Sequence, residues 1–223
     1  MLIVLNHKMN LGILEVQKYE KILRDLDVIV MPQIPYMGIF NKGMYTLGSQ
    51  KIDLSDVTGG ISAQAIKGMN AEYVLIGHFD QNDDDYVISK KIDEVSNHNL
   101  KPILCIGESK EDKLRNKGIY IIERKLSKIL SSVKTSVNNI IIAYEPSLDS
   151  ESVDIEYLNE VMFFIKSYIK DNYGFNVKVI YDGGVNSKNI RELLKINVAD
   201  GFILEDSSLD IYEVINIYET ING

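Results

Sequence analysis

Ile140-Ile141-Ile142-Ala143-Tyr144-Glu145-Pro146 is the stretch from which the fold can be worked out. Its β-branched residues are typical of a short strand that is buried on both faces. Pro146 cannot continue the hydrogen bonding of a strand, so Glu145 lies at the strand's C-terminal end. Proteins of the α/β class commonly position a catalytic base in this way. Glu145 is therefore a candidate base; for this segment alone, the alternative is a solvated acid at a strand end.

The same strand-then-helix pattern repeats along the chain, which predicts an α/β fold. Short apolar runs predict strands at residues 2–5, 27–31, 45–48, 72–77, 101–106, 139–144, 177–181 and 201–204. Apolar residues at helical spacing predict helices at 11–26, 62–69, 83–97, 111–133, 154–172, 187–195 and 208–220, with a weak helical piece at 36–41. Eight such units in 223 residues favour a closed (β/α)8 barrel with a parallel eight-stranded sheet, in a single domain spanning residues 1–223.

Polar side chains recur where the predicted strands end. In a barrel of this kind, the C-terminal ends of all strands face one mouth. Six polar residues fall at or just after these ends: Asn6, Lys8, His78, Glu145, Asp182 and Glu205. Neither a GxGxxG sequence after a strand nor a GxxxxGK[ST] loop is present, so the motifs of nucleotide-binding folds are missing.

Net charge, the cysteine count and hydropathy exclude several kinds of partner and site. The net charge of -8 and the pI of about 5.0 argue against nucleic acid or an anionic membrane as the main partner. The single cysteine, Cys105, excludes an internal disulfide and a multi-cysteine zinc site. Cys105 lies in an apolar run, which predicts a buried core thiol. No apolar stretch approaches membrane-spanning length, so we expect a cytoplasmic protein.

Five short motifs resemble, in the same order, those of the triosephosphate isomerase family. They are Asn6-His7-Lys8-Met9-Asn10, Tyr73-Val74-Leu75-Ile76-Gly77-His78, Cys105-Ile106-Gly107-Glu108, Ala143-Tyr144-Glu145-Pro146 and Asp200-Gly201-Phe202. The resemblance implies a TIM barrel without a cofactor. It also implies an aldose–ketose isomerase of glycolysis and gluconeogenesis that interconverts dihydroxyacetone phosphate and glyceraldehyde 3-phosphate through an enediolate.

The resemblance also implies a role for each of four residues. Glu145 matches the general base, and His78 the neutral electrophile that polarises the carbonyl. Lys8 matches the cation facing the enediolate, and Asn6 the hydrogen-bond donor beside it. Proton abstraction next to a carbonyl needs such a base, with donors aimed at the developing oxyanion. Taken singly, Lys8 could instead be a surface lysine, Asn6 a turn former and His78 a polar residue at a loop start.

The departures from the family cluster where it binds phosphate. The family's glycine pair after the eighth strand is replaced by Glu205 and Asp206, and its Gly-Gly-Ser after the seventh by Asp182-Gly183-Gly184. These five residues are the expected substrate-binding positions. A carboxylate about 4 Å from a phosphate charge costs roughly 4 kcal/mol at an effective dielectric of about 20. We hypothesise that Asp206 caps the last helix and fills the phosphate site. In the alternative, both acids point to solvent and the backbone still binds phosphate.

Three further segments differ from the family. Residues 147–152 form a shorter lid without glycine or tryptophan, and Asp80, in Phe79-Asp80-Gln81, stands in for a glutamate. The loop at 50–61 is also short, which puts the family's homodimer in doubt and leaves a monomer or a different dimer.

Asp182-Gly183-Gly184-Val185-Asn186 resembles a loop of ribulose-phosphate epimerases whose aspartate is an acid/base group. On that resemblance, Glu145 and Asp182 of this chain would act as a pair of bases. Those enzymes use additional histidine ligands, whereas this chain has only three histidines, so no metal site is expected.

Three functions remain open after the sequence. The first is the isomerisation of triose phosphates, supported by the retained Asn6, Lys8, His78 and Glu145. The second is the same enediolate chemistry on another hydroxy-carbonyl compound, possibly one without phosphate, supported by the altered phosphate end. The third is a non-catalytic barrel, supported by the altered lid, because an open site exposes an enediolate to water.

Overall fold

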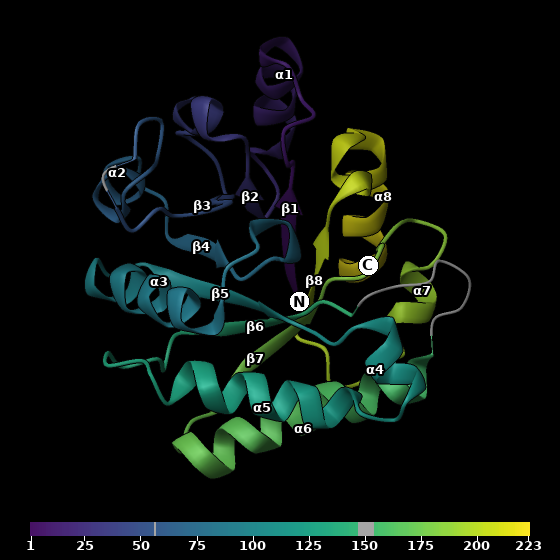
Figure 1. The fold of residues 1–223 in the computed structure, drawn as a ribbon. Helices are drawn as coiled ribbons and strands as arrows, with labels where there is room; N and C mark the ends of the chain where they lie inside the picture. Colours follow the sequence, from purple (N-terminus) through teal and green to yellow (C-terminus); the bar gives the residue numbers. More distant parts are fainter. Residues whose placement is uncertain (56, 147–153) are drawn as a thin grey trace.

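The computed structural model describes residues 1–55, 57–146 and 154–223, and it is a closed parallel barrel (Figure 1). The strands follow one another in sequence order, and β1 pairs with β8 to close the sheet. Their bounds are β1 Leu2–Asn6, β2 Ile29–Met31, β3 Thr46–Ser49, β4 Tyr73–Ile76, β5 Lys101–Ile106, β6 Ile141–Tyr144, β7 Lys178–Tyr181 and β8 Gly201–Leu204. The predicted (β/α)8 barrel is confirmed.

Alternate residues of each strand pack in two separate layers. One buried cluster is drawn from strands alone and fills the barrel; it contains Val4, Ile29, Met31, Leu75, Ile103, Cys105, Ile141, Ala143, Ile180 and Ile203. The intervening residues, such as Leu104 and Ile106, pack against the surrounding helices. Cys105 is a buried free thiol, as predicted, and burial raises its pKa. The barrel is thus a solid core that supports a site at its rim.

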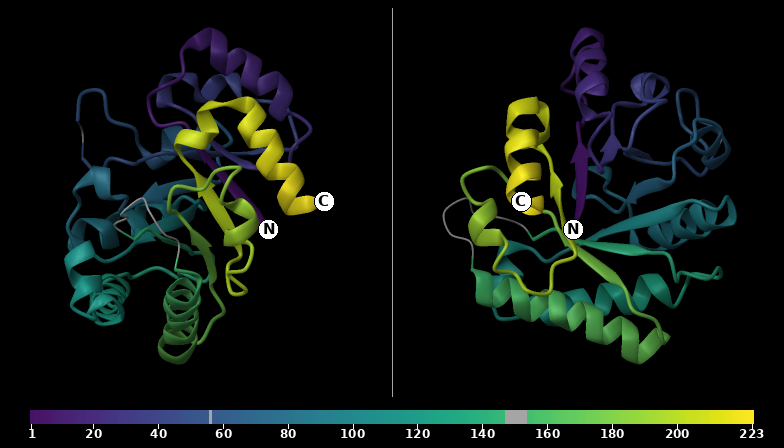
Figure 2. Two further views of the ribbon diagram at one scale, coloured as in Figure 1. Left: turned by 90° about the vertical axis from the view of Figure 1, so that its right-hand side faces the viewer. Right: turned by 180° about the vertical axis from the view of Figure 1, so that it is seen from behind.

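Helices surround the barrel on the outside (Figures 1 and 2). The α-helices are α1 Ile13–Leu23, α2 Ala63–Gly68, α3 Asp85–Asn97, α4 Lys110–Leu114, α5 Gly118–Leu130, α6 Ile155–Tyr173, α7 Ile190–Leu193 and α8 Ile211–Asn222. The described residues also form three short 3-10 helices: η1 Ile34–Ile39, η2 Phe79–Gln81 and η3 Asp206–Leu209. Within the described residues, no helix combines the length and the apolar character that crossing a membrane requires.

Two helix predictions are wrong in a way that affects the site. The helix expected at 111–133 is divided into α4 and α5, because Asn116 adopts a left-handed φ of 55° between them. The helix expected at 208–220 begins only after η3, and its N-cap is Asp210, whose side chain accepts from the amide of Tyr212. Asp206 therefore does not cap the last helix. The expected lid, residues 147–152, lies outside the described residues.

Candidate active site

The ends of the strands bring five charged or titratable side chains together at the mouth of the barrel. Lys8 follows β1, His78 follows β4, Glu145 follows β6, Asp182 follows β7 and Glu205 follows β8. Backbone hydrogen bonds extend the sheet one residue further at two of these positions. The amide of Glu145 donates to the carbonyl of Ile106, and the amide of Asp182 donates to that of Tyr144, each at 2.9 Å. These two carboxylates are thereby fixed to the rigid sheet.

Glu205 lies between Lys8 and His78. Its Oε1 atom is 3.1 Å from Nζ of Lys8 and 2.9 Å from Nε2 of His78. Burial opposes the charge of Glu205, but the hydrogen bonds from His78 and Lys8 hold its pKa below the usual value. An ionised carboxylate therefore occupies the two groups that the family resemblance assigns to the substrate oxyanion.

Lys8 is held by its backbone as well as by its charge. Its φ of 46° is in the left-handed region, which a residue with a Cβ rarely adopts. Asn6, buried at the end of β1, accepts from the amide of Lys8 through Oδ1 at 3.3 Å. The side chain of Gln50 donates to the carbonyl of Lys8 at 2.8 Å and to that of Met31 at 2.9 Å. Asn6 and Gln50 therefore fix the conformation that directs Lys8 to the site.

His78 is buried and sits between acids. Its Nδ1 atom accepts from the amide of Asp80 at 3.4 Å and lies 3.6 Å from Oδ2 of Asp80. Burial lowers the pKa of His78, but the hydrogen bond with Glu205 and the charges of Glu145, Asp182 and Glu205 outweigh it and raise the pKa above its usual value. The acids therefore favour the charged ring, whereas the resemblance predicts a neutral one.

Glu145 has the titration behaviour of a base that works near neutral pH. Burial raises its pKa to about 7, helped by the charges of Glu205 and Asp80 and opposed by His78 and the amide of Phe79. Its Oε1 atom lies 3.4 Å from Nε2 of His78. Gly107 makes room for this arrangement, because a Cβ there would overlap the carbonyl oxygen of Glu145.

Asp182 is the most deeply placed acid of the site. Its side chain is 3% exposed, and Oδ2 has no hydrogen-bond partner among the described residues. Burial and the charges of Glu205 and Glu145 raise the pKa of this carboxyl well above its usual value, against the opposing effect of His78 and Lys8. Uncompensated burial of this kind is costly, so it marks Asp182 as a group kept for a purpose other than stability.

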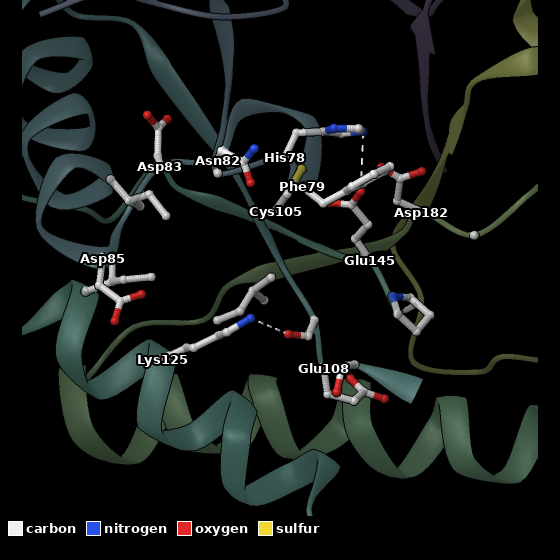
Figure 3. A pocket seen from close by; sticks show the side chains of 18 of the residues that line it. His78, Phe79, Asn82, Asp83, Asp85, Cys105, Glu108, Lys125, Glu145 and Asp182 are labelled. Carbon is white, nitrogen blue, oxygen red and sulfur yellow. Dashed lines mark hydrogen bonds and ion pairs between the residues drawn. The ribbon is translucent and has the colours of Figure 1, made fainter. Parts of the chain in front are cut away.

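A cavity of about 780 Å³ opens beside these groups (Figure 3). His78, Glu145, Asp182 and Glu205 line this cavity, together with Gly183 and Gly184. Asp206 is exposed and does not line the cavity. Of the five expected substrate-binding residues, the structure therefore brings four to the cavity and leaves out Asp206.

Three further residues support the site. Gln81 donates to the carbonyl of Gln50 at 2.9 Å and so links the ends of β3 and β4. Lys125 donates to the carbonyl of Gly107 at 2.7 Å (Figure 3). Glu108 is buried and accepts from the hydroxyls of Tyr144 and Tyr157 at 2.8 Å each. The Cys105–Glu108 motif pointed to Glu108, but no local pattern in the sequence singles out the others.

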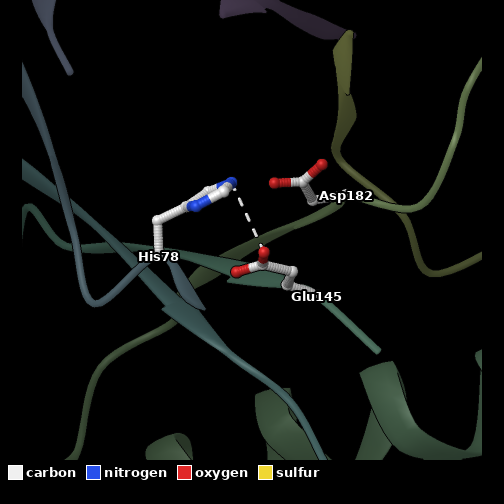
Figure 4. A group of neighbouring side chains, drawn as sticks. All are labelled: His78, Glu145 and Asp182. Carbon is white, nitrogen blue, oxygen red and sulfur yellow. Dashed lines mark ion pairs between the residues drawn. The ribbon is translucent and has the colours of Figure 1, made fainter. Parts of the chain in front are cut away.

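Three side chains at the mouth of the barrel, His78, Glu145 and Asp182, are arranged so that they could hold a metal ion. One ligand atom each from His78, Glu145 and Asp182 lies within 4.8 Å of the other two. Figure 4 shows all three side chains directed toward one another.

Comparison with known proteins gives a consistent result over the whole chain. A family model described as triosephosphate isomerase matches residues 1–221. The triosephosphate isomerase of Buchnera aphidicola subsp. Cinara cedri is 31% identical over 225 residues, covering 92% of this chain and 87% of that protein. That of Wigglesworthia glossinidia brevipalpis is 30% identical over 249 residues, covering 99% and 96%. That of Buchnera aphidicola subsp. Baizongia pistaciae is 30% identical over 204 residues, covering 83% and 81%.

Proposed function

Because the chain belongs to the triosephosphate isomerase family, we propose that the mouth of its barrel moves a proton between adjacent carbons of a hydroxy-carbonyl substrate. The chain is a triosephosphate isomerase-like enzyme, an intramolecular oxidoreductase of the aldose–ketose type that acts on a small molecule. By the family's reaction, the default substrate pair is dihydroxyacetone phosphate and glyceraldehyde 3-phosphate.

The adjacency of Glu145 and His78 is the observation that supports this proposal most directly. A base with a pKa of about 7 lies 3.4 Å from an imidazole nitrogen in a cavity that can admit a small substrate. Glu145 removes the proton from the carbon next to the carbonyl. His78 and Lys8 then stabilise the oxyanion that develops, with Asn6 as the donor beside them.

A second candidate substrate follows from Glu205. Its carboxylate pairs with Lys8 and His78 at 3.1 and 2.9 Å, so a substrate oxygen must displace it from both. Glu205 and Asp182 also stand where the family places phosphate-binding loops. A hydroxy-carbonyl compound without a phosphate avoids the repulsion of roughly 4 kcal/mol that each nearby carboxylate imposes on a phosphate charge at about 4 Å.

The deciding experiment is a coupled assay of both substrate types with the wild type and Glu145→Gln. Glu72→Gln is the matched control, because Glu72 is an exposed acid that pairs with Lys101 away from the mouth. Turnover that is lost only in Glu145→Gln supports the proposal, and the substrate that turns over identifies the pair. Equal rates in wild type and Glu145→Gln for both substrates would instead indicate a non-catalytic barrel.

Three further expectations belong to the same proposal. We propose that residues 1–223 form one domain, which the pairing of the first and last strands supports. We propose a cytoplasmic location, which suits the family's role in glycolysis and gluconeogenesis and which cell fractionation tests. The short loop at 50–61 favours a monomer, or a dimer of a different kind from the family's, and sedimentation measures which is present.

A further inference from the structure

We propose that His78, Glu145 and Asp182 form a binding site for one divalent transition-metal ion, such as Zn²⁺ or Mn²⁺. This site rests on the geometry of the side chains and holds whether or not the chain isomerises a triose phosphate. With only three histidines, the sequence leads to the expectation that no metal is bound; in the proposed site, carboxylates from two separate strands supply the other two ligands.

The distances fit a metal that takes nitrogen and oxygen ligands. Zn²⁺ binds imidazole nitrogen and carboxylate oxygen at about 2.0–2.2 Å, so two ligand atoms of a tetrahedral site are about 3.4 Å apart. Nε2 of His78 and Oε1 of Glu145 are 3.4 Å apart. The ligand atom of Asp182 lies within 4.8 Å of both, so binding requires a side-chain rotation that brings it closer. A mixed set of one imidazole and two carboxylates suits Zn²⁺ and Mn²⁺.

The unpaired oxygen of Asp182 is an independent observation that points to a cation ligand. Asp182 is only 3% exposed, yet its Oδ2 atom has no hydrogen-bond partner among the described residues. Its carboxylate points toward His78 and Glu145 (Figure 4). A buried carboxyl keeps its proton, is paired or coordinates a metal, and a divalent ion at this point would displace the proton and satisfy the oxygen.

The charges around the site favour a cation over an anion. Within the described part of the chain, the carboxylates of Glu145, Asp182 and Glu205 surround His78, and the ammonium group of Lys8 faces them. Glu205 already pairs with Lys8 at 3.1 Å, so the lysine charge is offset before an ion arrives. An ion of charge +2 would balance the remaining two carboxylates.

Asp80 lies near the second ring nitrogen of His78, where a metal-binding imidazole commonly has a carboxylate partner. When Nε2 of a histidine binds a metal, the proton moves to Nδ1, which then commonly donates to a carboxylate. Nδ1 of His78 lies 3.6 Å from Oδ2 of Asp80. Binding costs the hydrogen bond between Nε2 and Glu205 and the weak one from the Asp80 amide to Nδ1. The cavity of about 780 Å³ provides the entry path.

Occupation of this site blocks the proposed reaction. The ion would bind both the base, Glu145, and the electrophile, His78, so substrate and cation compete. The proposal therefore predicts a metal-inhibited isomerase.

Calorimetric titration of the metal-free protein with Zn²⁺ tests the site without using any substrate. We expect one ion per chain, and at least about tenfold weaker binding in Asp182→Asn. Two controls should bind as the wild type does: Asp206→Asn, a nearby exposed acid, and His98→Asn, a histidine outside the barrel mouth. Circular dichroism confirms that each variant is folded. Absence of binding, equal binding in Asp182→Asn, or loss of binding in His98→Asn would each overturn the proposal.

A second measurement locates the ion even if Asp182→Asn does not fold. Paramagnetic Mn²⁺ added to the wild type should broaden the imidazole NMR signals of His78 strongly and leave those of His98 sharp. Broadening of His98 alone, or of neither ring, would contradict the assignment. These readouts do not involve turnover, so they separate failure of the metal site from failure of the isomerase proposal.

Discussion

Glu205 forms a hydrogen bond with His78, with 2.9 Å between Oε1 and Nε2. Because the Asp80 amide donates to Nδ1, the proton of the neutral ring lies on Nε2 and points at Glu205. The ring's donor is thus already engaged by an acid of the same chain. Any substrate carbonyl that His78 polarises must first replace that acid, so Glu205 controls both the charge of the ring and access to it.

Removing the charge of Glu205 should improve the use of a phosphorylated substrate. We expect Glu205→Gln to raise kcat/KM for dihydroxyacetone phosphate by at least about tenfold, which corresponds to about 1.4 kcal/mol. The unscreened repulsion of about 4 kcal/mol at about 4 Å leaves room for this gain. Asp206→Asn is the control, since that acid is exposed and should change little. An unchanged or lower kcat/KM in Glu205→Gln would mean that the carboxylate does not oppose the phosphate.

The rate should depend on pH through Glu145. The base acts when ionised, so kcat/KM should rise with pH and reach half its maximum near the pKa of about 7. Glu205 helps to raise that pKa, so Glu205→Gln should shift the midpoint to lower pH. The check is a pH–rate profile of wild type and variant. A wild-type midpoint near the ordinary glutamate value of about 4.3 would show that Glu145 is not the group that titrates.

The fold was accessible from the sequence because it depends on patterns that repeat. Runs such as 140–144 mark strands by their β-branched residues, and eight such runs separated by helical patterns specify a closed barrel. The interruption between α4 and α5 was missed, because it depends on a single residue, Asn116, adopting a left-handed conformation. Asparagine tolerates that conformation without requiring it, so the sequence alone does not show the break.

The site was only partly predictable for a different reason. Strand ends placed Lys8, His78 and Glu145 at one mouth, but which way a side chain turns depends on its partners. Glu205 and Asp206 are adjacent acids, and the sequence favoured Asp206 as the one that caps the last helix and fills the phosphate site. The structure turns Glu205 inward onto Lys8 and His78 and leaves Asp206 exposed. The hypothesis for Asp206 was wrong because Asp210, four residues later, caps the last helix.

Asp182 should reduce the stability of the metal-free protein at neutral pH. Its pKa is raised in the folded state, so the folded protein holds a proton that the unfolded chain releases. The contribution of Asp182 to the free energy of unfolding should therefore be most favourable below the unfolded pKa of about 3.9 and become less favourable as pH rises toward the folded pKa. Asp182→Asn removes this loss.

Chemical denaturation at about pH 5 and about pH 8 measures the difference. We expect the wild type to lose more stability than Asp182→Asn between the two values. An unpaired buried polar group costs about 1–3 kcal/mol, and each kcal/mol corresponds to on the order of 2–4 °C in Tm for a chain of this size. Asp206→Asn should follow the wild type. A variant less stable than the wild type at about pH 8 would show that the Asp182 carboxylate is stabilising.

Gly107 should be required for the position of the base. A Cβ at this residue would overlap the carbonyl of Glu145, so Gly107→Ala must displace the backbone that carries the base. A misplacement of about 1 Å can reduce a rate about a hundredfold, and we expect a loss of at least that size in kcat. Gly68→Ala is the matched control, since a Cβ there meets nothing within 4 Å and alanine suits the helix α2. Turnover in Gly107→Ala equal to that of Gly68→Ala, with both variants folded by circular dichroism, would show that the contact between these two strand ends does not set the geometry of the base.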